Sequence, residues 1–183
     1  MKIKVKYVLY TVVILIALYL ALNFLFLNEQ KPTKFLSVGD VAPNYAFQLS
    51  NGSIENVDSY RGEPLLLWFV ATWCSSCAQG NSVLANNLAF FKAHNVKILE
   101  LEQYDDLGYS GMPISQFISE YGNNTYVQGG IAGYNMTLAY NTPPSLQLDI
   151  YYLIGPDGRV LYIGEGLATG INDLENFIAK EAL

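Results

Sequence analysis

The two cysteines of this chain, Cys74 and Cys77, stand three positions apart and are its only cysteines. They follow an apolar run at residues 65–70, and the residues from Ser75 onward have the pattern of a helix. Residues i and i+3 lie on one face of a helix, so the two thiols can bridge. The unpaired N–H groups and the positive end of the helix dipole stabilise a thiolate at the helix start. We therefore expect Cys74 to be an exposed attacking thiolate and Cys77 a resolving thiol, with a disulfide forming and breaking between them.

Two other uses of the cysteine pair stay open. A structural zinc site needs about four ligands, whereas the chain offers no further cysteine and one histidine, His94, placed in the predicted helix after Cys77. A purely structural disulfide that closes so small a loop would stabilise the fold by only about 2 kcal/mol. The pattern favours exchange chemistry over both, with no metal and no cofactor.

The residues around the pair predict alternating strands and helices. The continuous apolar run at 64–70 is typical of a buried strand, and residues 96–101 predict a second buried strand. A turn at 155–158 predicts a hairpin, and Asn172 begins a capping-box pattern that predicts the last helix. The predicted elements are strands 46–49, 64–70, 96–101, 150–154 and 159–163 and helices 75–94, 114–121 and 172–183. Their order predicts an α/β fold with a mixed central sheet flanked by helices.

The amino-terminal part predicts a membrane anchor. Residues 1–6 carry three lysines, and residues 7–27 carry no charge. A helix of that length spans about 31 Å, which matches the hydrocarbon core of a bilayer. The basic end favours an amino terminus inside. A cleaved signal peptide is the alternative, but it would have a shorter apolar region and a small-residue cleavage site. We expect residues 1–6 in the cytoplasm, a single transmembrane helix at 7–27, a stalk at 28–37 and an extracytoplasmic domain at 38–183, in the cell membrane.

Composition bears on partners and surface chemistry. The net charge of −6 and the pI near 4.6, with no basic cluster after the anchor, argue against nucleic acid as a partner. Charged residues make up 14% of the chain, against about 25% in typical soluble domains. Three sequons, at Asn51, Asn123 and Asn135, would suit glycosylation of an exposed outer domain. Chance is the alternative, because the chain is rich in asparagine.

Three blocks of sequence resemble the membrane-anchored, thioredoxin-fold thiol–disulfide oxidoreductases of the TlpA/ResA kind. The blocks are residues 38–43, residues 60–74 with the cysteine motif, and residues 152–160. The resemblance implies a thioredoxin-like fold over nearly all of 36–183. It also implies that Cys74 is the nucleophile, that Cys77 is the resolving thiol, and that Trp73 is an aromatic flank that meets the substrate.

The chain departs from that family pattern in places that bear on the site. Family members commonly carry a proline at the position of Ser82, and thioredoxin has a buried acidic residue at the position of Trp68. Counting back from the hairpin, the position of the family's cis-proline holds Asp149. Pro143 and Pro144 match that position only if about five residues are inserted. Pro144 and Asp149 are therefore the candidates for substrate binding in addition to Trp73.

Four acidic residues follow or end the predicted strand 96–101. In folds of this kind that edge lies near the active site, so one carboxylate could tune the protonation of the thiols or take up protons. A solvated loop is the alternative. The four residues are Glu100, Glu102, Asp105 and Asp106.

Two functions stay open at this point. The first is extracytoplasmic thiol–disulfide exchange on exported proteins, whose thiols or disulfides would be the partners. The second is a non-enzymatic thioredoxin-fold subunit or interaction module of a larger membrane protein complex. The motif favours the first, and the changes at Trp68 and Asp149 favour the second.

Overall fold

The structure, a computed structural model, describes residues 7, 10, 12–19, 35–122, 126–141 and 146–181. The chain divides into two compact units, residues 1–33 and 34–183. In the first unit, residues 12–19 are helical. None of the helices formed by the described residues has both the length and the apolar character that a membrane crossing requires. The predicted span at 7–27 lies mostly outside the described residues and stays a prediction, as do the stalk and the division into domains.

Among the described residues, seven strands of the second unit form one sheet in the order β2-β1-β5-β4-β3-β6-β7. The strands are β1 (Ala46–Leu49), β2 (Ile54–Asn56), β3 (Leu65–Val70), β4 (Lys97–Glu102), β5 (Gln128–Ala132), β6 (Ile150–Ile154) and β7 (Val160–Glu165). Strand β4 runs parallel to β3 and β5, and the other neighbouring pairs are antiparallel. The predicted mixed α/β sheet is therefore confirmed.

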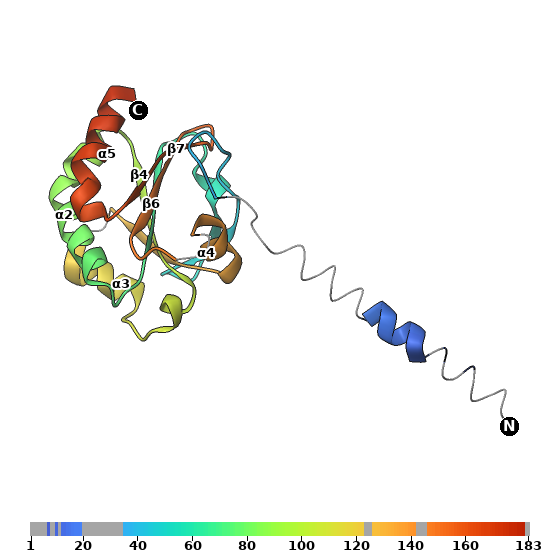
Figure 1. Cartoon of the computed structure of the whole chain (residues 1–183). Helices are drawn as coiled ribbons and strands as arrows, with labels where there is room; N and C mark the ends of the chain where they lie inside the picture. Colours follow the sequence, from blue (N-terminus) through green and yellow to red (C-terminus); the bar gives the residue numbers. More distant parts are fainter. Residues whose placement is uncertain are drawn as a thin grey trace. The chain divides into compact units, whose positions relative to one another are not determined.

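Helices cover the sheet on both sides. They are α2 (Ser75–Ala93), α3 (Ile114–Phe117), α4 (Tyr134–Tyr140) and α5 (Leu167–Glu181), with 3-10 turns η1 (Val57–Tyr60) and η2 (Tyr104–Gly108) and the π turn η3 (Ile118–Gly122). Figure 1 shows α2 and α5 side by side over one face, while α4 lies across the opposite face.

Strand β3 explains why both faces are covered. All six of its residues are buried, as the continuous apolar run predicts. Successive side chains of a strand point to opposite faces, and accordingly Leu66, Trp68 and Val70 enter the core beneath α2 and α5. Leu65, Leu67 and Phe69 enter the core on the side of α4. The strand that leads into the cysteine motif is thus held from both sides.

The element prediction was incomplete or wrong in several parts, and β2 and α4 were not predicted at all. The last helix begins at Leu167 rather than Asn172, because the buried stripe of Leu167, Ile171 and Leu174 extends the apolar face by a full turn. The capping-box residues lie inside the helix. Strand β5 was missed because its two glycines weaken the strand signal, although β5 pairs with both β1 and β4.

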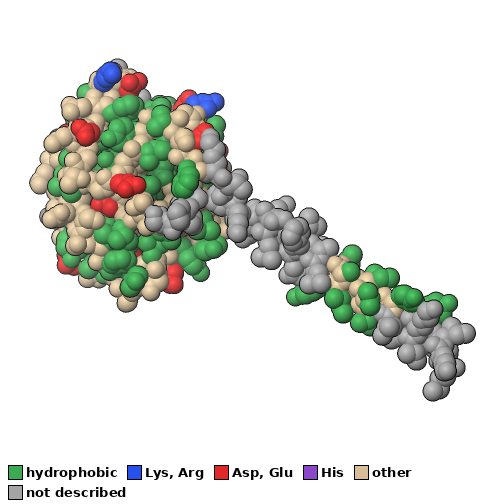
Figure 2. All heavy atoms as spheres, in the orientation of Figure 1, with side chains coloured by type: hydrophobic (Ala, Val, Ile, Leu, Met, Phe, Trp, Pro, Cys, Tyr) green, Lys and Arg blue, Asp and Glu red, His purple; other side chains and the backbone are tan. Residues whose placement is uncertain are grey.

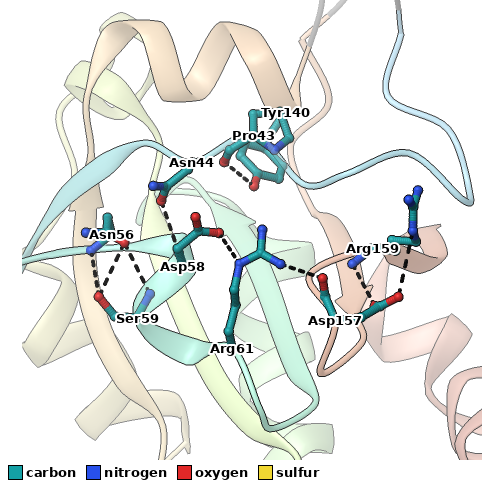
Figure 3. Close-up of polar contacts among 9 residues, drawn as sticks. All are labelled: Pro43, Asn44, Asn56, Asp58, Ser59, Arg61, Tyr140, Asp157 and Arg159. Atoms are coloured by element: carbon teal, nitrogen blue, oxygen red, sulfur yellow. Dashed lines mark hydrogen bonds and ion pairs between the residues drawn. The ribbon is translucent and has the colours of Figure 1, made fainter.

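Figure 3 shows how two of the sequence blocks meet. The Arg61 side chain donates from Nε to Asp58 Oδ1 at 2.8 Å and from a terminal nitrogen to the carbonyl of Asp157. A Cβ on Gly158, whose φ is +81°, would approach that guanidinium to 2.3 Å. Tyr140 donates to the carbonyl of Pro43 at 2.7 Å. These contacts join the segment around β1 to the β6–β7 hairpin and to α4.

The surface of the second unit mixes charge and apolar area. Figure 2 shows acidic side chains scattered over the face drawn, between patches of hydrophobic side chains. Exposed apolar residues of this unit include Trp73, Tyr104, Tyr109 and Tyr134. Asn51 and Asn135, two of the three predicted sequon residues, are exposed, while Asn123 lies outside the described residues.

Candidate functional site: a dithiol at the start of a helix

The cysteine pair lies where a buried strand passes into α2. Strands β3 and β4 are parallel and adjacent, so their carboxyl ends meet at one edge of the sheet. Cys74 is the residue that precedes the first turn of α2, and its carbonyl accepts the first helical bond from the N–H of Ala78 at 3.1 Å. The N–H groups of the first turn are therefore directed toward the sulfur-bearing end of the helix.

The two thiols differ in access. Both are free, and Cys77 is completely buried. The sequence predicts an exposed Cys74, but that residue is only 5% exposed. Its Sγ lies 3.0 Å from the hydroxyl of Ser76. Cys74 is enclosed because it packs in the same core cluster as Val70 and Ala71.

A surface hollow of about 450 Å³ leads to Cys74. Its lining carries no charged side chain and consists of Thr72, Trp73, Cys74, Ser75, Ala78, Gln79, Ser82, Phe117 and Tyr121. Trp73 forms one wall and its ring centroid lies 4.8 Å from that of Tyr109. Ser82, at the position where the family has proline, donates to the carbonyl of Tyr121 at 3.0 Å and so ties α2 to η3. The hollow suits an uncharged stretch of polypeptide.

A left-handed turn after β4 fixes the residues before Cys74. The Asp106 carboxylate accepts from the Thr72 N–H at 2.7 Å and from the Thr72 hydroxyl at 2.6 Å. The Asp106 carbonyl accepts from Trp73 Nε1 at 2.7 Å. The three residues from Asp105 to Leu107 all have positive φ, a conformation that costs energy for residues other than glycine. The solvated-loop alternative is therefore wrong for Asp106, which is buried and positions the motif.

We expect Asp106→Asn to lower the free energy of unfolding by about 1–3 kcal/mol, because an amide offers Thr72 one acceptor oxygen where the carboxylate offers two. Asp105→Asn is the matched control: it makes the same chemical change at an exposed neighbour with the same backbone conformation. Chemical denaturation of both variants checks the prediction. Equal effects of the two substitutions would show that the Thr72 contacts contribute nothing.

Beneath α2, the sheet places two carboxyl groups in the interior. Cross-strand pairing sets Glu100, Trp68 and Tyr151 side by side on three strands. Trp68 Nε1 donates to Asp149 Oδ1 at 2.7 Å, and that oxygen also accepts from the N–H of Leu167 at 3.2 Å. Asp149 is 6% exposed and Glu100 is fully buried. Sequence reasoning assigned Asp149 to substrate binding, but it does not line the hollow at Cys74.

Burial determines the protonation of these groups. It raises the pKa of Glu100 to about 8, against a hydrogen bond from Asn81 that lowers it, and the charge of Asp149 raises it further. Burial also raises the pKa of Asp149, while interactions with Trp68, the Leu167 N–H and the Ser76 hydroxyl oppose the rise. The pKa of Cys77 is raised by burial first and by the charge of Asp149 second. Cys77 is therefore a protonated thiol at neutral pH.

The remaining predicted residues are placed as follows. Trp73 lies beside Cys74, as expected of an aromatic flank. Pro143 and Pro144 lie outside the described residues, so the cis-proline stays untested. His94 ends α2 and its ring packs against Phe90. Within the described ranges, no group of three or more His, Cys, Asp or Glu residues could hold a metal ion.

Comparison with known proteins supports the fold and the chemistry of the site. The model of the AhpC/TSA family matches residues 38–163. The thiol-disulfide oxidoreductase ResA of Bacillus subtilis is 29% identical over 168 residues, which cover 90% of this chain and 89% of the relative.

Solved structures share the fold. A candidate thiol:disulfide interchange protein DsbE from Chlorobium tepidum aligns with a TM-score of 0.65 and 21% identity, over 81% of this chain and 99% of its own. The thioredoxin domain of a thiol-disulfide oxidoreductase from Bacteroides vulgatus aligns with a TM-score of 0.57 and 18% identity, over 77% of this chain and 99% of its own. Likeness at this identity shows the fold alone, and it confirms the predicted thioredoxin-like arrangement.

Proposed function

The chain belongs to the AhpC/TSA family and is a thiol–disulfide oxidoreductase, and from that premise we propose that it exchanges disulfides with exported proteins outside the cytoplasm. One observation carries the proposal. Cys74 stands at the amino end of α2 and opens into an uncharged hollow, with the free thiol of Cys77 one turn behind it. In that arrangement Cys74 can meet a substrate disulfide, and Cys77 is positioned to resolve the mixed disulfide that forms.

The proposed exchange has two steps. The Cys74 thiolate attacks a substrate disulfide, forming a mixed disulfide and releasing one substrate sulfur as a thiolate. Cys77 then loses its proton and attacks Cys74 Sγ, so the intramolecular disulfide forms and the second substrate thiolate leaves. Two electrons pass from the dithiol to the substrate, and the reverse sequence oxidises a substrate dithiol. Trp73 and the aromatic wall of the hollow would hold the polypeptide around the substrate cysteine.

The alternative of a non-enzymatic interaction module is not favoured. Its main support was the loss of familiar residues around the dithiol, namely the acid at the position of Trp68 and the cis-proline at that of Asp149. The relatives carry names of thiol–disulfide oxidoreductases, and the thiols of this chain are free. Membership of a larger membrane complex stays a prediction.

The extracytoplasmic location rests on the amino-terminal sequence. Three lysines precede an uncharged stretch at 7–27, which supports a helix that anchors the chain with its amino terminus inside. Exported proteins are the proposed substrates because they are the disulfide-bearing proteins of that compartment. The sequons at Asn51, Asn123 and Asn135 would then face the same medium.

We expect full-length Cys77→Ser, expressed in cells, to accumulate covalent complexes with exported proteins. The variant can attack through Cys74 but cannot resolve the mixed disulfide. Complexes are separated without reductant and their partners identified by mass spectrometry. Partners that are mainly proteins of the cytoplasm would contradict the proposed location.

Two controls separate location from chemistry. The double variant Cys74→Ser, Cys77→Ser should capture nothing, which shows that the complexes pass through Cys74. A reporter fused after Leu183 that is active only outside the cytoplasm should be active in the same cells. A silent reporter together with captured cytoplasmic partners would retain the exchange chemistry and overturn the location.

A further inference from the structure

Three buried polar atoms without a hydrogen-bond partner in the described part of the chain lie beneath α2, the helix that carries the dithiol. The buried side-chain oxygens without a hydrogen-bond partner, among the described residues, are Asn81 Oδ1, Glu100 Oε2, Asp149 Oδ2 and Glu175 Oε1. The first three belong to a single region beneath α2, since Asn81 donates to Glu100 at 2.7 Å and the charge of Asp149 acts on Glu100. Unpaired buried polar atoms are costly in a native fold. A cluster of them beside a reactive thiol therefore calls for a functional explanation.

Asp149 lies on the face of the sheet beneath α2, the helix that carries Cys77, and its charge acts on the Cys77 thiol. Asp149 lies two residues before Tyr151 and so shares the face on which Tyr151 and Trp68 contact the core beneath α2. The Trp68 indole reaches α2 at Gly80, where an added Cβ would come within 2.7 Å of it. Gly80 is three residues after Cys77 and lies on the same face of the helix. The indole therefore bridges the carboxylate of Asp149 to the helix face that carries the buried thiol.

The exchange reaction needs a proton acceptor near Cys77 when the mixed disulfide is resolved. Cys77 is completely buried, so bulk water does not reach its thiol, yet it must become a thiolate to attack. Asp149 Oδ1 is held by Trp68 and Leu167, Oδ2 has no described partner within hydrogen-bond distance, and the Ser76 hydroxyl is near enough to lower the pKa of the carboxyl group. Held in this way, the carboxylate is fixed in place with one oxygen left to receive a proton.

We propose that Asp149 accepts the proton of Cys77 when Cys77 attacks the mixed disulfide on Cys74. This inference rests on the exchange function proposed above. As the proton moves to Asp149, the Cys77 sulfur bonds to Cys74 Sγ and the bond between Cys74 and the substrate sulfur breaks. The substrate leaves as a thiolate, and Asp149 later returns its proton to water. Trp68 thus serves to orient the acceptor.

Glu100 is the second carboxyl group of the arrangement. Two carboxylates close together in a buried site do not both ionise readily, so they titrate as a pair. The titratable groups that act on Asp149 or are acted on by it are Cys77 from α2, Glu100 from β4 and Tyr151 from β6. At neutral pH the tyrosine and the thiol are uncharged, because burial raises the pKa of each. Glu100, whose pKa is about 8, is mostly protonated at neutral pH, so it does not repel the Asp149 carboxylate there, whereas the charge of Asp149 raises the pKa of Glu100.

The test follows two successive thiol releases from the full-length reduced chain. One equivalent of a coloured aromatic disulfide, dithiobis-nitrobenzoate, reacts first with Cys74 and releases one aryl thiolate. Resolution by Cys77 releases the second. We expect Asp149→Asn to leave the first release unchanged and to slow the second about 100-fold or more at neutral pH. The second release should then rise with hydroxide concentration instead of levelling off.

The asparagine retains an oxygen for the Trp68 and Leu167 donors, and an unchanged unfolding midpoint confirms that the variant folds. Glu100→Gln is the matched control: it makes the same chemical change at the neighbouring carboxyl group and should keep fast resolution at neutral pH, because Glu100 is already uncharged there. If Asp149→Asn resolved the mixed disulfide at the wild-type rate, or if Glu100→Gln slowed resolution as much as Asp149→Asn, the role of Asp149 would be overturned. If the wild-type chain gives no first release at all, the exchange function itself fails.

Discussion

Replacing Cys74 with serine is expected to reduce the rate of disulfide reduction to that of the uncatalysed reaction. A serine hydroxyl stays protonated near neutral pH and forms no disulfide, so the first step has no nucleophile. The neighbouring thiol cannot take over, because Cys77 is fully buried and does not line the hollow. The measurement is reduction of a protein disulfide by the full-length chain with a thiol reductant as electron source.

Cys77→Ser is the matched control, since it makes the same atomic change three residues away. Reduced beforehand and assayed without added reductant, it should release one equivalent of substrate thiol and then stop, because Cys74 attacks and remains in a mixed disulfide. Cys74→Ser therefore traps no substrate, whereas Cys77→Ser traps substrate as a mixed disulfide. If both variants trapped substrate equally well, the roles assigned to the two cysteines would be wrong.

Stability is expected to fall by several kcal/mol as pH rises from about 4.5 to about 8. The cause is Glu100, whose pKa is 4.5 when solvated and is raised to about 8 by burial. Within that window the folded chain binds a proton that the unfolded chain has released. The unfolding free energy therefore decreases with rising pH, by about 1.4 kcal/mol for each unit of pKa shift. Chemical denaturation at a series of pH values, followed by tryptophan fluorescence, measures this slope.

Glu100→Gln should remove most of the decrease in unfolding free energy with rising pH. It should also stabilise the chain near pH 8, because the amide carries no charge to bury. Glu102→Gln is the control two positions along the same strand. The pKa of Glu102 is raised to about 7, by burial and then by the charges of Asp106 and Asp105, but its side chain is partly exposed. Solvent screening makes its effect smaller. A stability that rises through the window would contradict the buried, protonated state of Glu100.

The strand and helix that carry the dithiol could be predicted because local rules agree there. A continuous apolar run is what a strand covered on both faces requires, and β3 is such a strand. The cysteine motif follows that run directly, which predicted its place at the start of a helix, and Cys74 is the residue that precedes α2. The hairpin of β6 and β7 could be predicted from the turn between them, which needs Gly158 at positive φ.

The acidic groups around the site were harder to place because their positions depend on contacts distant in sequence. Asp106 binds Thr72 because η2 turns back in a left-handed conformation, which aspartate adopts as a single residue but which three consecutive residues rarely share. Asp149 reaches Trp68 through strand pairing between β3 and β6. For Glu100 a signal existed: it interrupts an apolar strand that was expected to be buried, so its carboxyl group had to be buried too.

The central claim is that Cys74 and Cys77 are a reversible redox pair. The most direct test is to equilibrate the full-length chain with thiol–disulfide buffers of graded potential and to count free thiols by alkylation and mass. We predict that both thiols disappear together within one chain, in a reversible two-electron transition whose ratio changes tenfold for about every 30 mV. Thiols that persist in oxidising buffer, or that pair only between chains, would contradict the account.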